Sequence, residues 1–213
     1  MDVGKRVTGL VLAGGKSRRF GSDKATAPFL GTTLLERAVA ALEPLVSEVI
    51  IVGRTEIPAS LASSRCVPDD CPGHGPLGGL YTGLLAMHGD MGITVACDMP
   101  LINTALFAHM LAAMETHDVV IPLLDTPEQL HAIYRRTCIT PIRRRLEAGQ
   151  LRMTSFFPDV AVRWVKRSEM EEIEAGATSC INVNTRAEAD MVLTLLAARR
   201  CETPGLPPLD PAR

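Results

Sequence analysis

The 213-residue sequence lacks a long apolar run, and it lacks an excess of charge of either sign. No stretch approaches the ~20 apolar residues that a membrane-spanning helix needs. The polar N-terminal residues are not those of a secretory signal, so we expect a cytoplasmic protein. The 22 Lys and Arg residues nearly balance the 24 Asp and Glu residues, which disfavours a nucleic-acid scaffold and a polybasic membrane-binding surface.

The six cysteines lack the spacing of a metal site or of a disulfide framework. No C-x-x-C motif occurs, and the closest pair, Cys66 and Cys71, has no second pair at ligand spacing. Reduced cysteine packs as a small hydrophobic residue. Scattered buried thiols are therefore the favoured interpretation, and a zinc-binding or disulfide-bonded structural protein is a distant alternative.

Apolar runs alternate with amphipathic stretches along most of the chain. The predicted strands are Val7–Leu12, Val49–Val52, Ile93–Cys97, Val119–Leu123, Ala132–Tyr134 and Val160–Val165. The predicted helices are Leu34–Leu45, Leu77–Met87, Ala105–Glu115, Pro141–Ala148 and a final helix from Ala187 to about Arg200. Two of the helix starts are supported by S/T-x-x-E capping boxes, Thr33 with Glu36 and Thr185 with Glu188.

This alternation predicts a single α/β domain over residues 1–200. Strands joined by helices form a mostly parallel sheet that is covered on both faces. Ligands bind such sheets outside the carboxyl ends of the strands. The proline-rich residues 201–213 are expected to be a disordered tail.

A loop rich in glycine and cations follows the first predicted strand. Glycines let backbone N–H groups approach an anion closely, and cations neutralise charge there. Neither G-x-x-x-x-G-K-[ST] nor G-x-G-x-x-G occurs in this loop. The combination nevertheless favours a triphosphate. Its glycines are Gly14, Gly15 and Gly21, and its cations are Lys16, Arg18, Arg19 and Lys24.

Asp98 stands at the carboxyl end of the predicted strand Ile93–Cys97, directly before Met99 and Pro100. A carboxylate in this position can hold Mg²⁺ against phosphate oxygens. The alternative is a turn or a cap for the following helix. The phosphate-binding character of the first loop favours the metal.

Asn182 and Asn184 lie on one face if their segment ends a strand. An amide oxygen can bind Mg²⁺, and the amide nitrogen can donate to a substrate phosphate. The alternative is that Asn184 or Thr185 only caps the last helix. The two functions are compatible, and Asn182 is the stronger candidate for binding.

A second glycine-rich loop, residues 68–80, opens a predicted helix. Its N–H groups would favour an anion or an acceptor atom of a base, and Asp69 could accept from a base amine or a ribose hydroxyl. A flexible loop is the alternative. His131 is expected to pack or to orient substrate. Residues 151–157 form either a short helix facing a second substrate or a hydrophobic patch that supports the core.

These motifs occur in the order seen in molybdenum cofactor guanylyltransferases, which the chain resembles from about Val7 to about Leu196. The resemblance implies a three-layer α/β/α nucleotidyltransferase fold of the nucleotide-diphospho-sugar transferase type, which is Rossmann-like. Gln129 departs from a common proline in the half that meets the second substrate. The motifs are Leu12-Ala13-Gly14-Gly15, Arg18-Arg19, Asp23-Lys24, Gly75-Pro76-Leu77-Gly78-Gly79-Leu80, Cys97-Asp98-Met99-Pro100 and Asn182-Val183-Asn184-Thr185.

By the same resemblance, GMP would pass from GTP to the phosphate of molybdopterin with Mg²⁺ as cofactor, releasing pyrophosphate. The acceptor is already an anion, so no general base is required. The expected catalytic residues are Lys24, Arg18 and Asp98. The expected nucleotide-binding residues are Leu12, Ala13, Gly14, Gly15, Lys24, Asp69, Gly78 and Asp98. Asn182 would join Asp98 at the metal, and Asn182 and Asn184 would bind the acceptor.

The resemblance also implies transient contacts with a molybdenum-insertion factor and with molybdoenzymes. Related cytidylyltransferases share the first loop, so cytidylyl transfer to the same pterin stays open, as does transfer to another small phosphorylated acceptor. A nucleotide- or cofactor-binding protein without turnover is an alternative of another class. Retention of both Lys24 and Asp98 argues against it.

Overall fold

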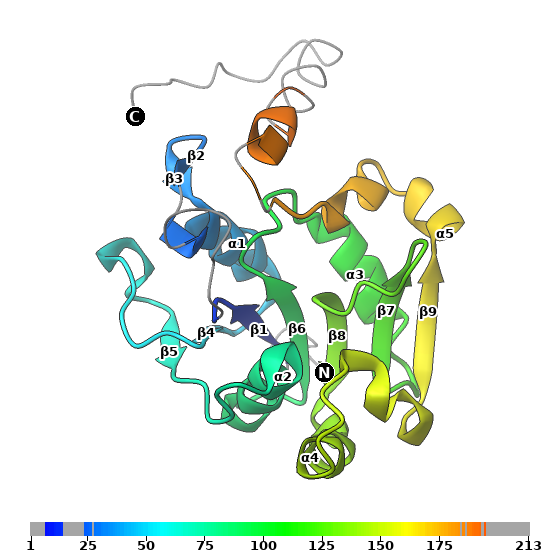
Figure 1. The fold of residues 1–213 in the computed structure, drawn as a ribbon. Coiled ribbons are helices and arrows are strands. Elements are labelled where there is room, and N and C mark those ends of the chain that lie inside the picture. Colours follow the sequence, from blue (N-terminus) through cyan, green and yellow to red (C-terminus); the bar gives the residue numbers. More distant parts are fainter. Residues whose placement is uncertain are drawn as a thin grey trace.

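A seven-stranded sheet forms the centre of the protein in the computed structural model, which describes residues 7–14, 24–26, 28–183, 185, 187–192 and 194 (Figure 1). The strand order is β5-β4-β1-β6-β8-β7-β9. β8 runs antiparallel to its neighbours β6 and β7, and the other pairs are parallel. The strands are β1 (Val7–Leu12), β4 (Glu48–Val52), β5 (Arg65–Val67), β6 (Met91–Ala96), β7 (Val119–Leu123), β8 (His131–Arg135) and β9 (Val162–Lys166).

Helices cover both faces of this sheet. Strand residues alternate between the faces, so Val7 and Val11 of β1 pack with α1 and α3, while Leu10 and Leu12 pack with α2 and α4. The predicted three-layer α/β/α fold is thereby confirmed. The helices are α1 (Leu34–Leu42), α2 (Gly75–Ala86), α3 (Thr104–Ala112), α4 (Ile139–Glu147) and α5 (Arg167–Glu171).

Both predicted capping boxes are present. Thr33 N donates to Glu36 Oε2 at 2.7 Å, and Glu36 N donates to Thr33 Oγ1 at 3.2 Å. The corresponding distances for Thr185 and Glu188 are 3.0 and 3.2 Å. Residues 187–192 are helical, as predicted, and residues 195–213 lie outside the described part of the chain. These reciprocal bonds satisfy backbone donors that a helix start otherwise leaves open.

The shortest elements were not predicted from the sequence. β5 has three residues, and the separate antiparallel pair β2 (Pro28–Phe29) and β3 (Thr32–Thr33) has two in each strand. Such lengths are too short to show a periodicity. Residues 151–157 enter the 3-10 helix Met153–Asp159, whose Met153 and Phe156 are buried in the core beside α2 and α4. This supports the core-packing interpretation of that segment.

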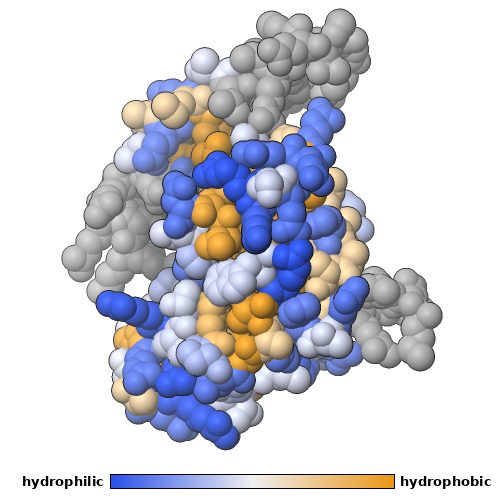
Figure 2. Space-filling view, turned by 90° about the vertical axis from the view of Figure 1, so that its right-hand side faces the viewer, coloured by the Kyte–Doolittle hydropathy of each residue, from blue (hydrophilic) through white to orange (hydrophobic). Residues whose placement is uncertain are grey.

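β9 is one of the two edge strands of the sheet, and β5 is the other. Figure 2 views the molecule from the side of β9 and shows a largely hydrophilic surface with separate, small apolar patches. Arg163 and Lys166 lie on β9 itself, and charged side chains on an edge discourage pairing with another chain. In the described residues, no helix is long and apolar enough to cross a bilayer.

Candidate active site

A cavity of about 780 Å³ opens where the parallel strands β1, β4 and β6 end. Five residues that the sequence placed in a nucleotide site line it together: Leu12, Ala13, Gly14, Asp69 and Asp98. They come from three separate segments of the chain. This is the edge at which the parallel-sheet rule places a ligand.

Two glycines allow the ends of β1 and β4 to approach closely in the wall of this cavity. A Cβ on Gly53 would lie 2.7 Å from Gly14 Cα, and Gly53 has a φ of +87°. Ala13 N donates to Val52 O at 3.0 Å, which holds the ends of β1 and β4 together. Gly53 lines the cavity and was missed by the sequence analysis. The signal available was a single glycine directly after an apolar strand, which is common wherever backbones approach closely.

The second glycine-rich loop fixes Asp69 in the cavity wall. Asp69 Oδ1 accepts a hydrogen bond from Cys71 N at 2.9 Å and lies 3.4 Å from the donating hydroxyl of Thr82. The Thr82 hydroxyl also accepts from Asp70 N at 3.1 Å, and Thr82 is fully buried on α2. The loop is therefore tied to the helix that it opens, and the flexible-loop alternative is disfavoured.

The N-terminus of α2 faces the same cavity through Gly75, Pro76 and Gly79. Gly78, expected to bind nucleotide, is not among the lining residues. It packs against the loop instead, because a Cβ there would lie 2.9 Å from Cys71 O. Unsatisfied N–H groups and the positive end of the helix dipole make this end of α2 favourable for an anion or an acceptor atom.

Asp98 lies just beyond β6, and its carbonyl accepts a hydrogen bond from Val183 N at 2.8 Å. This bond brings the predicted ligand Asn182 to the Asp98 loop. Leu106 N donates to Asn103 Oδ1 at 3.0 Å, so Asn103 is the N-cap of α3. The alternative that Asp98 caps this helix is therefore wrong.

Glu128 lies near Asp98 and Asn182 and was not singled out by the sequence analysis. The pKa of Glu128 is raised, chiefly by burial and also by the nearby Asp98 carboxylate. A hydrogen bond from the Asn182 side chain offsets part of this rise. Ala96 N donates to Leu130 O at 3.0 Å, which places the start of β8 beside the end of β6. Only the antiparallel direction of β8 gives this juxtaposition, and no residue spacing in the sequence marks it.

The chemistry of this donor set fits a magnesium ion. Asp98 and Glu128 supply carboxylate oxygens and Asn182 an amide oxygen, and Mg²⁺ prefers a few such ligands together with water and substrate phosphates. The described residues contain no group of three or more His, Cys, Asp or Glu side chains arranged for a metal ion. The part of the chain that the structure describes therefore holds no zinc-type site.

His131 is fully buried at the start of β8, with Nε2 2.9 Å from Ser179 Oγ. Burial lowers its pKa to about 3, so the imidazole is neutral at physiological pH. This supports the predicted packing role. Several predicted residues lie outside the described part: Gly15, Arg18, Asn184 and the side chain of Lys24.

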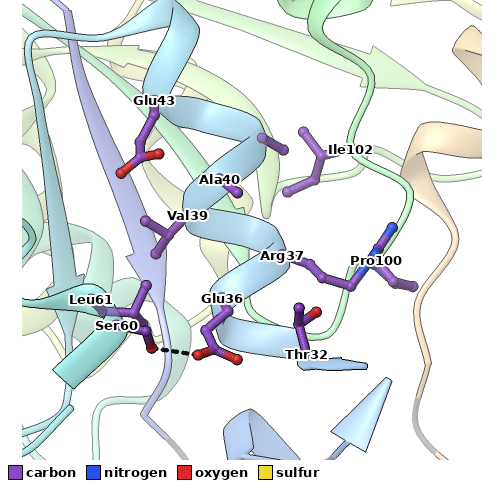
Figure 3. A pocket seen from close by; sticks show the side chains of 11 residues that line it. Thr32, Glu36, Arg37, Val39, Ala40, Glu43, Ser60, Leu61, Pro100 and Ile102 are labelled. Atoms are coloured by element: carbon purple, nitrogen blue, oxygen red, sulfur yellow. Dashed lines mark hydrogen bonds between the residues drawn. The ribbon is translucent and has the colours of Figure 1, made fainter. Parts of the chain in front are cut away.

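A second cavity, of about 560 Å³, follows α1 (Figure 3). Glu36 closes the helix cap there and accepts a hydrogen bond from Ser60, and the Arg37 guanidinium lies 5.4 Å from the centroid of the Phe29 ring. None of the described residues that were predicted for the site lines this cavity. Its polar groups serve the packing of α1.

Comparisons with known proteins identify the family of this chain. A family model described as "MobA-like NTP transferase domain" matches residues 9–160. A "Probable molybdenum cofactor guanylyltransferase" from Chloroflexus aggregans is 36% identical, with 92% of this chain and 98% of the relative covered. A protein of the same name from Pelotomaculum thermopropionicum is 33% identical, with 93% and 96% covered.

The fold also matches solved structures. Molybdopterin-guanine dinucleotide biosynthesis protein A from Archaeoglobus fulgidus superposes with a TM-score of 0.76 at 22% identity, over 90% of this chain and 99% of that one. A 4-diphosphocytidyl-2C-methyl-D-erythritol synthase from Anaerococcus prevotii gives 0.67 at 16% identity, over 91% and 99%. At these identities the likeness concerns the fold. Together with the family match and the relatives, it leads to one conclusion: the chain belongs to the family of MobA-like NTP transferase domains.

Proposed function

We propose that this protein transfers GMP from GTP to the terminal phosphate of molybdopterin and releases pyrophosphate, with Mg²⁺ as cofactor. The observation that carries the proposal is the meeting of Leu12, Gly14, Asp69 and Asp98 around one cavity, in a chain 36% identical to a probable molybdenum cofactor guanylyltransferase over nearly the full length of both. The reaction draws on GTP, and we propose that it takes place in the cytoplasm.

The acceptor phosphate would attack the α-phosphorus of GTP in line. A bond forms between an acceptor oxygen and the α-phosphorus, while the bond from that phosphorus to the bridging oxygen of pyrophosphate breaks. Because the nucleophile is already an anion, no side chain has to remove a proton. The main obstacle is the approach of two polyanions, which positioning and charge neutralisation overcome.

In this mechanism one group of residues would bind the nucleotide and another would bind the metal ion. Asp69 and the N-terminus of α2 would bind the guanosine, while Leu12, Ala13, Gly14 and Gly15 would line the nucleotide. Asp98 and Asn182 would hold Mg²⁺, which supplies charge neutralisation at the triphosphate when bound.

The charged residues of the first loop would act on the phosphates. Lys24 would offset charge at the α-phosphate, and Arg18 would favour the departing pyrophosphate. Asn182 and Asn184 would orient the acceptor. The product is a labile cofactor, so we also propose direct transfer to a molybdenum-insertion factor or to a molybdoenzyme.

Thermal unfolding with GTP, CTP, ATP and UTP, each with and without Mg²⁺, tests the proposal. A nucleotide at about 100 times its dissociation constant adds about 2.7 kcal/mol, which raises the midpoint by roughly 5–11 °C at this chain length. We expect a shift with GTP and Mg²⁺ that Asp98→Ala abolishes. A shift with CTP alone would contradict guanylyl transfer. Formation of the dinucleotide from molybdopterin and GTP then tests the acceptor.

A further inference from the structure

The segment of residues 174–183 carries Asn182, yet its regular structure is confined to the short 3-10 helix Gly176–Cys180. In Figure 1 it follows α5 and passes beside the carboxyl end of β6. Three hydrogen bonds join it to the loop between β6 and α3: Asn103 Nδ2 to Glu174 O at 2.7 Å, Asn103 N to Ser179 Oγ at 2.8 Å, and Val183 N to Asp98 O at 2.8 Å. The position of Asn182 therefore depends on contacts with residues that are distant in the sequence.

A fourth contact comes from β8. Ser179 Oγ accepts from Asn103 N, so its own proton can go to the neutral His131 Nε2, 2.9 Å away. Ser179 and His131 are both fully buried. The imidazole also packs on Phe107, with ring centroids 4.4 Å apart. Among the described residues His131 Nδ1 has no hydrogen-bond partner, so Ser179 is the polar contact that fixes this ring.

We propose that Asn103, Ser179 and His131 are positioning residues that hold Asn182 beside Asp98 and Glu128, the side chains that would hold Mg²⁺. This inference rests on the proposed function and deepens it. Mg²⁺ needs nearly ideal octahedral geometry, so a small displacement of one ligand weakens binding. Residues that orient metal ligands typically contribute a factor of about 10 to 100 in metal affinity.

The chemistry of the network supports positioning rather than packing alone. Cluster residues around it, such as Val95, Phe107 and Cys180, are apolar or weakly polar and buried. A buried polar network is costly there, but it fixes one arrangement when its bonds are made. Asn103 also does more than cap α3, because its Nδ2 reaches across to Glu174 O. An aspartate, serine or threonine would cap the helix equally well without that bond.

The test is Mn²⁺ binding, measured by electron paramagnetic resonance on the whole chain with an α,β-methylene analogue of GTP that cannot react. Ser179→Ala removes the hydroxyl shared by Asn103 N and His131, and we expect Mn²⁺ affinity to fall by about 10- to 100-fold. In steady-state assays kcat should fall, while the KM for GTP should change little, because the guanosine side of the cavity is untouched. Asn103→Asp keeps the cap but replaces the donor to Glu174 O by a carboxylate oxygen that the carbonyl repels, and it should show a loss of the same kind.

Ile142→Val is the matched control. It trims a buried side chain in the core between α2 and α4, so it should lower thermal stability and leave Mn²⁺ affinity unchanged. The inference is overturned if Ser179→Ala and Asn103→Asp bind Mn²⁺ as the wild type does, whatever their melting temperatures. Failure of the wild-type protein to bind Mn²⁺ with the analogue would instead overturn the proposed function, and this inference with it. If Ser179→Ala does not fold, the Mn²⁺ affinity of Asn103→Asp alone decides whether the inference holds.

Discussion

The cavity at the ends of β1, β4 and β6 and the group of polar side chains around Asp98 are built in different ways. The cavity proposed for the nucleotide, called the nucleotide half below, is built largely from backbone: the ends of β1 and β4 meet at Gly14 and Gly53, and α2 presents its N-terminus. The proposed metal site, called the metal half below, is made of side chains: Asp98 lines the cavity, and Glu128 and Asn182 lie beside Asp98, on three segments that tertiary hydrogen bonds hold together. Local sequence specifies the first half, whereas long-range packing assembles the second.

The largest effect is expected in the metal half. Asp98→Ala should lower kcat by about a hundred- to a thousandfold, since loss of one stabilising group for developing charge costs about 2.7–4 kcal/mol. GMP transfer to the pterin is the assay, and circular dichroism checks the fold. Asp125→Ala, at a side chain that is 98% exposed, is the control and should keep full activity. Equal turnover by both variants would remove Asp98 from the mechanism.

The sequence could predict the nucleotide half because its signals are short. An apolar strand followed by glycines and cations identifies the first loop, and two members of the metal half, Asp98 and Asn182, also carry local signals. Glu128 could not be found this way, because its approach to Asp98 depends on the antiparallel direction of β8. Ser179 could not be found either, because its hydrogen-bond partners His131 and Asn103 lie 48 and 76 residues away in the sequence. Glycine and strand patterns are local properties of the chain, while the meeting of Asp98 and Asn182 with Glu128 is a property of the packed fold.

A single glycine substitution should disrupt the nucleotide half. Gly53→Ala would put a methyl group 2.7 Å from Gly14 Cα at a φ of +87°, so we expect about 1–3 kcal/mol of destabilisation from the backbone strain. The clash should weaken GTP binding as well. Gly149→Ala is the matched control, because Gly149 has a φ of +68° and nothing within 4 Å of the added Cβ. Denaturant unfolding and GTP titration of both variants separate the effect of backbone strain from that of the steric clash. Equal GTP affinity in the two variants would mean that GTP binding does not require the close approach of Gly53 to Gly14.

Acid should lower the stability of the folded protein through His131, which belongs to the network that we propose to position Asn182. Its pKa is lowered to about 3 by burial, from an ordinary 6.5. Between these values the unfolded chain binds a proton that the folded chain does not. The free energy of unfolding should therefore fall as the pH drops from 6.5 towards 3, by about 1.4 kcal/mol per pH unit from this group. His131→Leu should flatten that dependence in unfolding curves measured at pH 7, 6 and 5. An unchanged slope would mean that the histidine does not stay neutral in the folded protein.

The smallest effect tests whether the nucleotide half is backbone alone. Thr82 holds Asp69 from within α2, and Thr82→Val replaces its hydroxyl by a methyl group of similar size. Loss of these bonds should cost about 1 kcal/mol of GTP binding, a roughly fivefold rise in KM at unchanged kcat, because the reacting phosphates are held elsewhere. Thr94→Val is the control: Thr94 is as buried as Thr82, and among the described residues its hydroxyl has no hydrogen-bond partner. If both variants keep the wild-type KM, Asp69 needs no orientation from α2, and the contrast between a backbone-built half and a side-chain-built half becomes sharper.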